Sequence, residues 1–205
     1  MKSKLVRSLW LFGLAGLLAG TAWLVFRPAR PLAVREARRE TLTLREGRLY
    51  RAGETTPFSG VVTEVQDHGT LRSRSSVVNG LLEGVSEGWH TNGQLQVREH
   101  FVAGVSHGPR LKWHPNGQKL SEATIVQGRI EGVFRRWHED GSLAEEIPMT
   151  AGQPDGLARS YFPSGFLQAE ARLRKGQVLT QRFWKDGENP APALAQSMSP
   201  SGASK

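Results

Sequence analysis

The sequence predicts an all-β fold, an elongated antiparallel meander of tandem β-hairpins, preceded by one N-terminal transmembrane helix. Three observations predict it. A Trp-His-x-(Asn/Asp)-Gly element recurs every 24 residues, two series of single glycines keep the same interval, and a long uncharged apolar run stands near the N-terminus. Self-similarity at a fixed interval is the signature of a repeat architecture, in which each unit packs on its neighbours.

The apolar run covers residues 8–26 and follows Lys2, Lys4 and Arg7. From Leu9 it holds 18 uncharged residues, close to the roughly 20 that span a bilayer. A cleaved signal peptide is the alternative, because residues 20–22 are small. The run continues past that point through residues 23–26, which favours an uncleaved anchor over residues 1–26.

Residues 27–41 are predicted to be a basic linker, because Pro28 and Pro31 disfavour regular structure. We expect its arginines to lie at the membrane surface, where anionic headgroups attract them. These residues are Arg27, Arg30, Arg35, Arg38 and Arg39. The short basic N-terminus favours export of the repeats, whereas the linker arginines favour the opposite orientation under the positive-inside rule.

The repeat domain is predicted over residues 42–188. The Trp-His element stands at residues 89–93, 113–117 and 137–141, with degenerate copies at 65–69, 161–165 and 184–187. One glycine series comprises Gly60, Gly84, Gly108, Gly132 and Gly156, and the other comprises Gly80, Gly104, Gly128, Gly152 and Gly176. Residues 189–205, rich in Pro, Ala and Ser, are predicted to be a disordered tail.

Each repeat reads as two strands. Asn-Gly or Asp-Gly between extended residues indicates a hairpin turn, and a second turn is predicted between glycines such as Gly104 and Gly108. Strand alternation places Leu111 and Trp113 on one face and Arg110 and Lys112 on the other. An apolar residue also recurs eight positions after each turn glycine, at Val77, Phe101, Ile125, Met149 and Leu173.

These motifs resemble the variant MORN (membrane occupation and recognition nexus) repeat, in the YwqK-type family of bacterial antitoxins. The resemblance covers about residues 44–187 and is most specific at residues 47–50, residues 56–62 and the Trp-His turns. It implies a long, twisted, antiparallel sheet with a curved face. It also implies a role as the antitoxin or immunity partner of a toxin. The predicted anchor and the fifth turn, Ser164-Gly165 without Asn or Asp, depart from the family pattern.

Composition excludes several classes of function. The chain has no cysteine, so disulfides and cysteine-ligated zinc are excluded. Its formal net charge of +8 lies mostly near the N-terminus, because residues 42–188 hold 18 Lys and Arg against 17 Asp and Glu. Nucleic-acid binding needs a basic face, so we do not expect it. No nucleophile–base pair and no glycine-rich phosphate loop stand in the sequence, so we expect neither an enzyme nor a cofactor or small-molecule substrate.

Two ladders of side chains are the candidate sites. His90, His114 and His138 suggest a metal, but equivalent residues two strands apart lie about 9–10 Å from one another, too far to share one ion. We therefore interpret them as part of the turn. The aromatic ladder comprises Trp89, Trp113, Trp137 and Tyr161. It either packs on the Val77, Phe101 and Ile125 row as a thin core, or anchors a protein partner.

The sequence therefore predicts a membrane-tethered module for protein–protein interaction, whose partner could be a toxin. We place it in the bacterial inner membrane as a single-pass protein with its repeats on the periplasmic side; secretion after signal cleavage is the alternative. A non-catalytic envelope scaffold that binds a lipid surface, and a passive spacer without a partner, are the competing functions.

Overall fold

The structure is a computed structural model that describes residues 35–188. The predicted anchor over residues 1–26, Arg27 and Arg30 of the linker, and the predicted tail over residues 189–205 lie outside the described residues. Within residues 35–188, no helix is long and apolar enough to cross a membrane.

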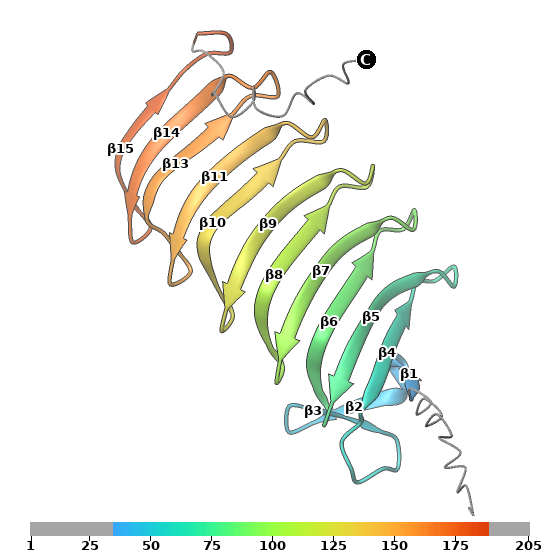
Figure 1. The fold of residues 1–205 in the computed structure, drawn as a ribbon. Coiled ribbons are helices and arrows are strands. Elements are labelled where there is room, and N and C mark those ends of the chain that lie inside the picture. The colour runs from blue at the N-terminus through green and yellow to red at the C-terminus, as the bar shows by residue number, and fades with distance from the viewer. Residues whose placement is uncertain (1–34, 189–205) are drawn as a thin grey trace, which may run out of the picture. The chain divides into compact units, whose positions relative to one another are not determined.

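Nearly all of the described chain forms one antiparallel meander (Figure 1). Each strand pairs with its sequence neighbours in the order β4 to β11, then β13, β14 and β15, with β1 added beside β4 and β12 beside β11. The bounds are β4 Gly60–Val65, β5 Leu71–Val78, β6 Leu81–Trp89, β7 Leu95–Val102, β8 Val105–Trp113, β9 Lys119–Val126, β10 Arg129–Trp137, β11 Leu143–Thr150, β12 Gln153–Pro154, β13 Gly156–Tyr161, β14 Leu167–Arg174 and β15 Gln177–Phe183. The predicted meander of 24-residue hairpins is confirmed.

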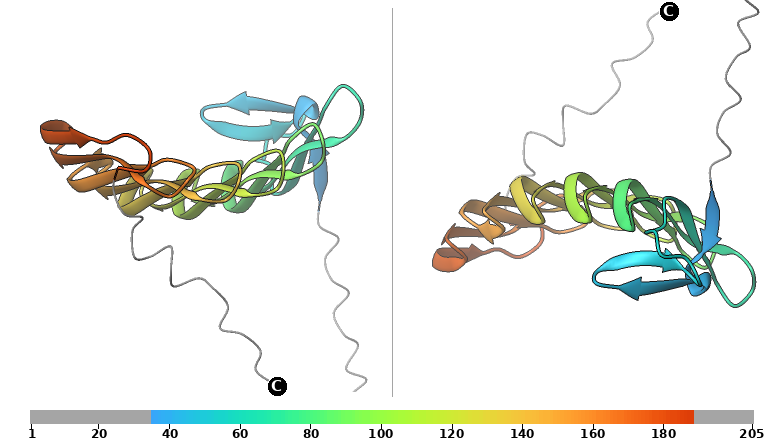
Figure 2. Two further views of the ribbon diagram at one scale, coloured as in Figure 1. Left: turned by 90° about the horizontal axis from the view of Figure 1, so that it is seen from above. Right: turned by 90° about the horizontal axis from the view of Figure 1, so that it is seen from below.

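The sheet has two unlike faces. Its strands are curved, and the small β2–β3 hairpin (Leu42–Arg45 and Arg48–Arg51) lies inside the curve (Figure 2). We call that side the inner face and the opposite side the outer face. The register places Ile125, Ala123 and Ser121 of β9 on the inner face, and all three are buried although the sheet is a single layer there. Curvature explains this burial, because side chains converge on the inside of a bend.

Two-residue turns join the strands along one edge of the sheet. They are Asn79-Gly80, Ala103-Gly104, Gln127-Gly128, Ala151-Gly152 and Lys175-Gly176, and both residues of each have positive φ. Positive φ at both positions defines the type I′ turn, whose twist matches that of the strands. The five glycines of this series are therefore explained by their backbone conformation.

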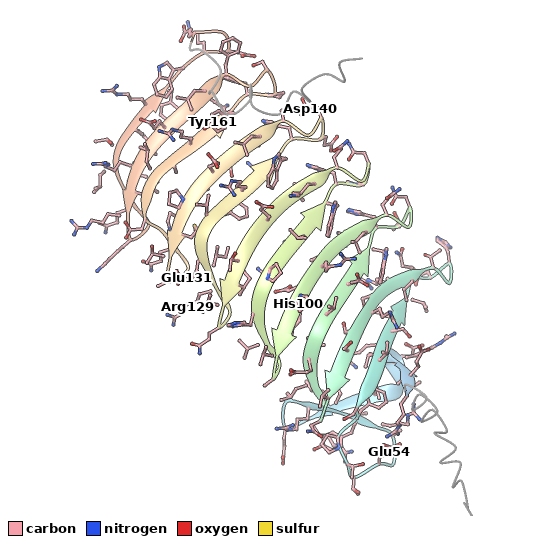
Figure 3. The ribbon with its side chains drawn as sticks, viewed as in Figure 1. Glu54, His100, Arg129, Glu131, Asp140 and Tyr161 are labelled. Atoms are coloured by element: carbon pink, nitrogen blue, oxygen red, sulfur yellow. The ribbon has the colours of Figure 1, made fainter. Side chains whose placement is uncertain are left out.

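Longer turns, formed by the Trp-His elements, line the other edge. In the first, the amide of Gly93 donates to the carbonyl of His90 over 3.0 Å, and the amide of His90 donates to the carbonyl of Gln94 over 2.9 Å. In each of these turns the glycine has positive φ, and the Asn or Asp before it does not. The turn is therefore not type I′ but a type I turn closed by a glycine bulge. In Figure 3, Asp140 marks this edge and Arg129 and Glu131 mark the opposite one.

The prediction that Gly104 and Gly108 bracket the second turn is wrong. Gly108 lies inside β8, and the turn itself is only residues 103–104. Its φ of +105° accompanies an irregularity in which residues 107–109 of β8 oppose one residue of β7, because Glu99 pairs with Arg110 and Phe101 with Ser106. Gly84 of β6 and Gly132 of β10 occupy the same position. Extra residues on one strand bend it, so Gly84, Gly108 and Gly132 mark bends within β6, β8 and β10.

A cap covers the N-terminal end of the sheet. β1 (Glu36–Arg38) pairs in parallel with residues 61–63 of β4, and the 3₁₀ helix η1 (Arg39–Thr41) leads into the β2–β3 hairpin. Phe58 is fully buried, and with Ala37, Leu42, Val62 and Val77 it forms the core of this cap. The ordered fold therefore begins before the predicted domain boundary at residue 42. This difference arises because η1 and β1 pack on the sheet.

Candidate interaction surface

Each histidine of the ladder forms a hydrogen bond that connects its turn to the next repeat. Nε2 of His90, His114 and His138 lies 2.9, 3.0 and 2.9 Å from the carbonyl oxygen of the aromatic residue of the next repeat, which is Trp113, Trp137 or Tyr161. Asn92 and Asn116 reinforce this edge, because their Nδ2 atoms donate to Pro115 and Glu139 carbonyls. Among the described residues, no group of His, Cys, Asp and Glu has the geometry of a metal site.

The aromatic ladder lies on the outer face, beside the Trp-His turns. Trp89, Trp113 and Trp137 are half-buried, whereas the Tyr161 side chain is only 3% exposed. The Lys119 ammonium lies 4.7 Å from the centre of the Trp137 ring, where the π face attracts a cation. The three tryptophans thus present part of their rings to solvent, while Tyr161 is in the position of a core residue. Burial raises the pKa of the Tyr161 hydroxyl, and the nearby carboxylates add to that effect.

The tryptophans do not pack on the Val77, Phe101 and Ile125 row, contrary to one interpretation of the sequence. Phe101 of β7 pairs with Gly84 of β6 and so lies on the same face as that residue. Trp89 stands five positions after Gly84 on β6, so the side chains of Trp89 and Phe101 point to opposite faces. Val77, Phe101 and Ile125 belong to the inner face. The aromatic ladder and the inner core are therefore separate rows on opposite sides of one layer.

A row of charged side chains crosses the middle of the outer face. The register joins Arg74, Glu87, Arg98, Leu111, Glu122, Arg135, Glu146, Arg159, Glu170 and Arg182 on successive strands. Ion pairs form along it: Arg98 with Glu87 at 2.8 Å, Arg135 with Glu146 at 2.8 Å and Glu122 at 3.3 Å, and Arg159 with Glu170 at 3.1 Å. The sign alternates from strand to strand, so the row is close to neutral.

Leu111 is the one uncharged member of this charge row. Its register neighbours are Arg98 on β7 and Glu122 on β9. A carboxylate here would attract Arg98 and repel Glu122, and a cation would do the reverse, because like charges directly opposite destabilise a sheet. Leucine avoids either conflict.

Glu122 is the member whose ionisation responds most clearly to this environment. Burial alone would raise its pKa, but hydrogen bonds and charges from Lys119 and Arg135 outweigh burial and hold the pKa below its ordinary value of 4.5. An acid with a lowered pKa in the folded state stabilises the fold above its unfolded pKa. That stabilisation is lost as the pH falls through the lower, folded pKa.

We therefore expect Glu122→Gln to lower the free energy of unfolding by about 1 kcal/mol at pH 7, and this difference should shrink as the pH falls through the lowered, folded pKa of the native carboxyl. Urea denaturation of both proteins across this pH range measures the difference. Glu139→Gln is the matched control, because Glu139 lies exposed in a turn and its side chain forms no ion pair within the described residues. Equal pH profiles for the two variants would contradict the role assigned to Glu122.

A row of exposed valines lies on the outer face along the type I′ edge, and sequence analysis missed it. Val78, Val102 and Val126 end β5, β7 and β9 at 24-residue spacing, and they are 48%, 54% and 42% exposed. Val105, which pairs with Val102, extends the row at 48%. Val133 is also exposed, at 41%, but it stands in the middle of β10. The sequence held a signal for this row. Each of β5, β7 and β9 ends in two successive apolar residues, such as Val77-Val78, and strand alternation must turn one of the two to solvent.

The inner face carries its own features. A hollow of about 400 Å³ opens between the β2–β3 hairpin and the sheet, lined by Leu44, Leu49, Val77 and Leu82 with the carboxylate of Glu64. Further along, Arg110 pairs with Glu99, and Arg136 pairs with Glu145. Glu145 and Glu146 form ion pairs with different arginines, Arg136 and Arg135, and they point to opposite faces of β11.

The linker arginines within the described residues contact the cap. Arg35 pairs with Glu54 at 2.8 Å and lies 5.5 Å from the Phe58 ring centre. Arg38 lies 3.7 Å from Glu40, and Arg39 donates to the Leu42 carbonyl over 3.2 Å. The predicted role of these three residues at a membrane surface stays a prediction, and their guanidinium groups contribute to the cap itself.

The comparison with known families matches the repeats. Three consecutive segments, residues 82–103, 106–127 and 130–150, match the family model of the MORN repeat variant. Each segment spans one hairpin of the meander, β6–β7, β8–β9 or β10–β11. MORN repeats are commonly modules for interaction with proteins or membranes. No curated protein matches the chain in sequence.

Proposed function

We propose that residues 35–188 form an interaction module that binds a protein partner on the outer face. The observation that carries this proposal is the valine row, in which four apolar side chains between 42% and 54% exposed, Val78, Val102, Val105 and Val126, lie along one edge of one face. Exposed apolar patches on a folded protein commonly mark interaction sites. The half-buried tryptophans form a second apolar row across the charge row, and Trp is enriched among the residues that anchor protein interfaces.

The charge row favours a protein over a polyanion. Its carboxylates and guanidinium groups pair with one another, so the middle of the outer face offers little net positive charge to phosphates or anionic headgroups. A partner that covers this face needs two apolar strips separated by polar groups. Such a surface suits another folded protein, because protein interfaces combine buried apolar contacts with direct hydrogen bonds between polar groups.

Site-specific photo-crosslinking of the full chain in its native membranes tests this assignment. A photoreactive residue at Val126 on the outer face should capture one protein, whereas the same residue at Lys112 on the inner face should not. Against that protein, the Val102→Ser/Val126→Ser and Trp113→Ala/Trp137→Ala variants should bind at least about 30-fold more weakly, which corresponds to about 2 kcal/mol. Unchanged affinity with intact folding, or capture from Lys112 alone, would overturn the assignment to the outer face.

The narrower identity of the partner follows from the family resemblance. We propose that it is a toxin which this module neutralises, because residues 44–187 resemble the YwqK-type family of antitoxins. Expression of the captured protein should then arrest growth, and co-expression of the repeat protein should restore it. A captured protein without toxicity would instead support an envelope scaffold.

We also propose that residues 1–26 tether the module to the bacterial inner membrane, with the repeats on the periplasmic side. The uncharged run over residues 8–26 supports this. If the chain resists alkaline extraction from membranes, this would support the tether. If added protease digests the repeats in spheroplasts, this would support their periplasmic location. An intact N-terminus would distinguish the anchor from a cleaved signal peptide.

A further inference from the structure

The two ends of the sheet are unlike. At the N-terminal end, β1 occupies the outer edge of β4 along residues 61–63, and the amide of Val61 donates to the Arg35 carbonyl over 2.8 Å. At the C-terminal end, β15 is the last strand, and within residues 35–188 no strand pairs with its outer edge. An unpaired edge presents a row of free amides and carbonyls that another strand can bind.

The side chains of β15 do not protect this edge. All seven residues are exposed, including Val178 at 54%, Leu179 at 55% and Phe183 at 70%. Edge strands are commonly protected by proline, by lysine or by very short length, whereas β15 has no proline and only one charged residue, Arg182. Its one irregularity is Leu179, an extra residue opposite β14, and Thr180 to Phe183 pair regularly with β14 beyond it.

We infer that the outer edge of β15 pairs with β15 of a second copy of this chain, in the antiparallel direction. This inference goes beyond the proposed function and does not depend on it. The chain's other edge is a poorer partner strand, because it ends in β1, which has only three residues. Head-to-tail stacking into a filament would rest on that short strand, whereas a contact between two identical β15 edges closes as a twofold dimer.

Charge favours the antiparallel direction. Arg174 and Lys175 stand just before β15, whereas Asp186 and Glu188 stand just after it, with Lys185 between β15 and Asp186. Antiparallel pairing brings the basic start of one strand beside the net acidic end of the other. Parallel pairing would place like charges together. Because one seven-residue strand is a small interface, we expect a reversible dimer whose population rises with protein concentration.

A proline substitution in β15 tests whether this strand forms the dimer. The amide of Trp184 donates to the Gln168 carbonyl on β14, so alternation turns the amide of Gln181 outward, away from β14. Gln181→Pro should therefore keep the pairing with β14 and abolish the dimer in sedimentation velocity of the full chain in neutral detergent. Gln181→Ala is the matched control and should leave the dimer unchanged. Dimerisation that survives Gln181→Pro with unchanged melting temperature would overturn the inference.

Cysteine crosslinking identifies the direction, since the chain has no natural cysteine. Single cysteines are placed at Leu179, Thr180 and Gln181 and oxidised under identical conditions. A twofold antiparallel pair brings only one position of a strand opposite its own copy, so one variant should crosslink at least tenfold faster than the other two. Similar rates at all three positions would indicate a parallel pair and would contradict the inference.

Two other occupants of the edge give different results. If residues 189–205 of the same chain cover β15, the full chain stays monomeric and a chain ending at residue 188 dimerises. If a different protein covers it, both chains stay monomeric at every concentration. Either result would overturn pairing with a second copy.

Discussion

Replacing Phe58 by alanine should lower the free energy of unfolding by about 3–5 kcal/mol, the usual cost of removing a buried aromatic ring. Phe58 is 0% exposed and packs with Ala37, Leu42, Val62 and Val77 in the only cluster of buried apolar residues that the described chain forms at its N-terminal end. The guanidinium groups of Arg35 and Arg51 lie 5.5 and 5.6 Å from its ring centre, so they would lose their contacts too.

Urea denaturation measures this cost, and Leu44→Ala is the control. Leu44 lies in the same cap but is 63% exposed, so its truncation should cost less than about 0.5 kcal/mol. Because each hairpin contacts only its neighbours, loss of the cap should first release the adjacent strands. Amide exchange in the Phe58 variant should therefore quicken in β4 and β5 and stay nearly unchanged in β13 and β14. A uniform increase across the sheet would contradict this local role.

A second large effect is expected at Gly80, where a methyl group has no room. Gly80 and Gly176 occupy the same position of a type I′ turn, with φ of +78° and +79°. A Cβ on Gly80 would lie 2.7 Å from Arg48 Cβ and 2.9 Å from the backbone nitrogen of Leu49, whereas a Cβ on Gly176 would meet nothing within 4 Å. The hairpin cap approaches one turn and not the other.

Gly176→Ala should therefore cost about 1 kcal/mol, which is the strain of alanine at positive φ. Gly80→Ala carries the same strain and must also displace the β2–β3 backbone, so we expect about 3–4 kcal/mol from it. It would further disturb the bonds in which Gly80 donates to the Phe58 carbonyl and accepts from the Leu49 amide. Paired thermal or urea melts measure the difference, and equal costs would show that the cap does not press on this turn.

Turn chemistry is local, which is why the sequence predicted the meander. Asn92-Gly93 and its equivalents mark one edge from a few residues alone, and the 24-residue spacing then places every strand. The same reasoning placed Gly108 in a turn, which is wrong, because a glycine has positive φ both in a turn and at an irregularity within a strand. Only the register of β7 against β8 distinguishes the two cases.

The two faces could be predicted only in part. Alternation separated Leu111 and Trp113 from Arg110 and Lys112, and the register agrees. Which face would be concave depended on the bends at the in-strand glycines, so the burial of Ile125 and the exposure of Val126 could not be assigned. The cap was missed because β1 is three residues long and pairs with β4 across 25 positions of sequence, and no local pattern reports such contacts.

The change of sign at Leu111 limits how this array can gain or lose units over evolution. Before it, the first strand of a hairpin contributes Glu87 and the second contributes Arg98; after it, Arg135 and Glu146 take the opposite signs. Deleting 24 residues beyond Leu111, such as 129–152, would bring Glu122 opposite Arg159 and keep the attraction. Deleting residues 105–128 would bring Arg98 opposite Arg135, cation against cation. Units can therefore be added or removed freely on the C-terminal side, while the unit that holds Leu111 is a fixed junction.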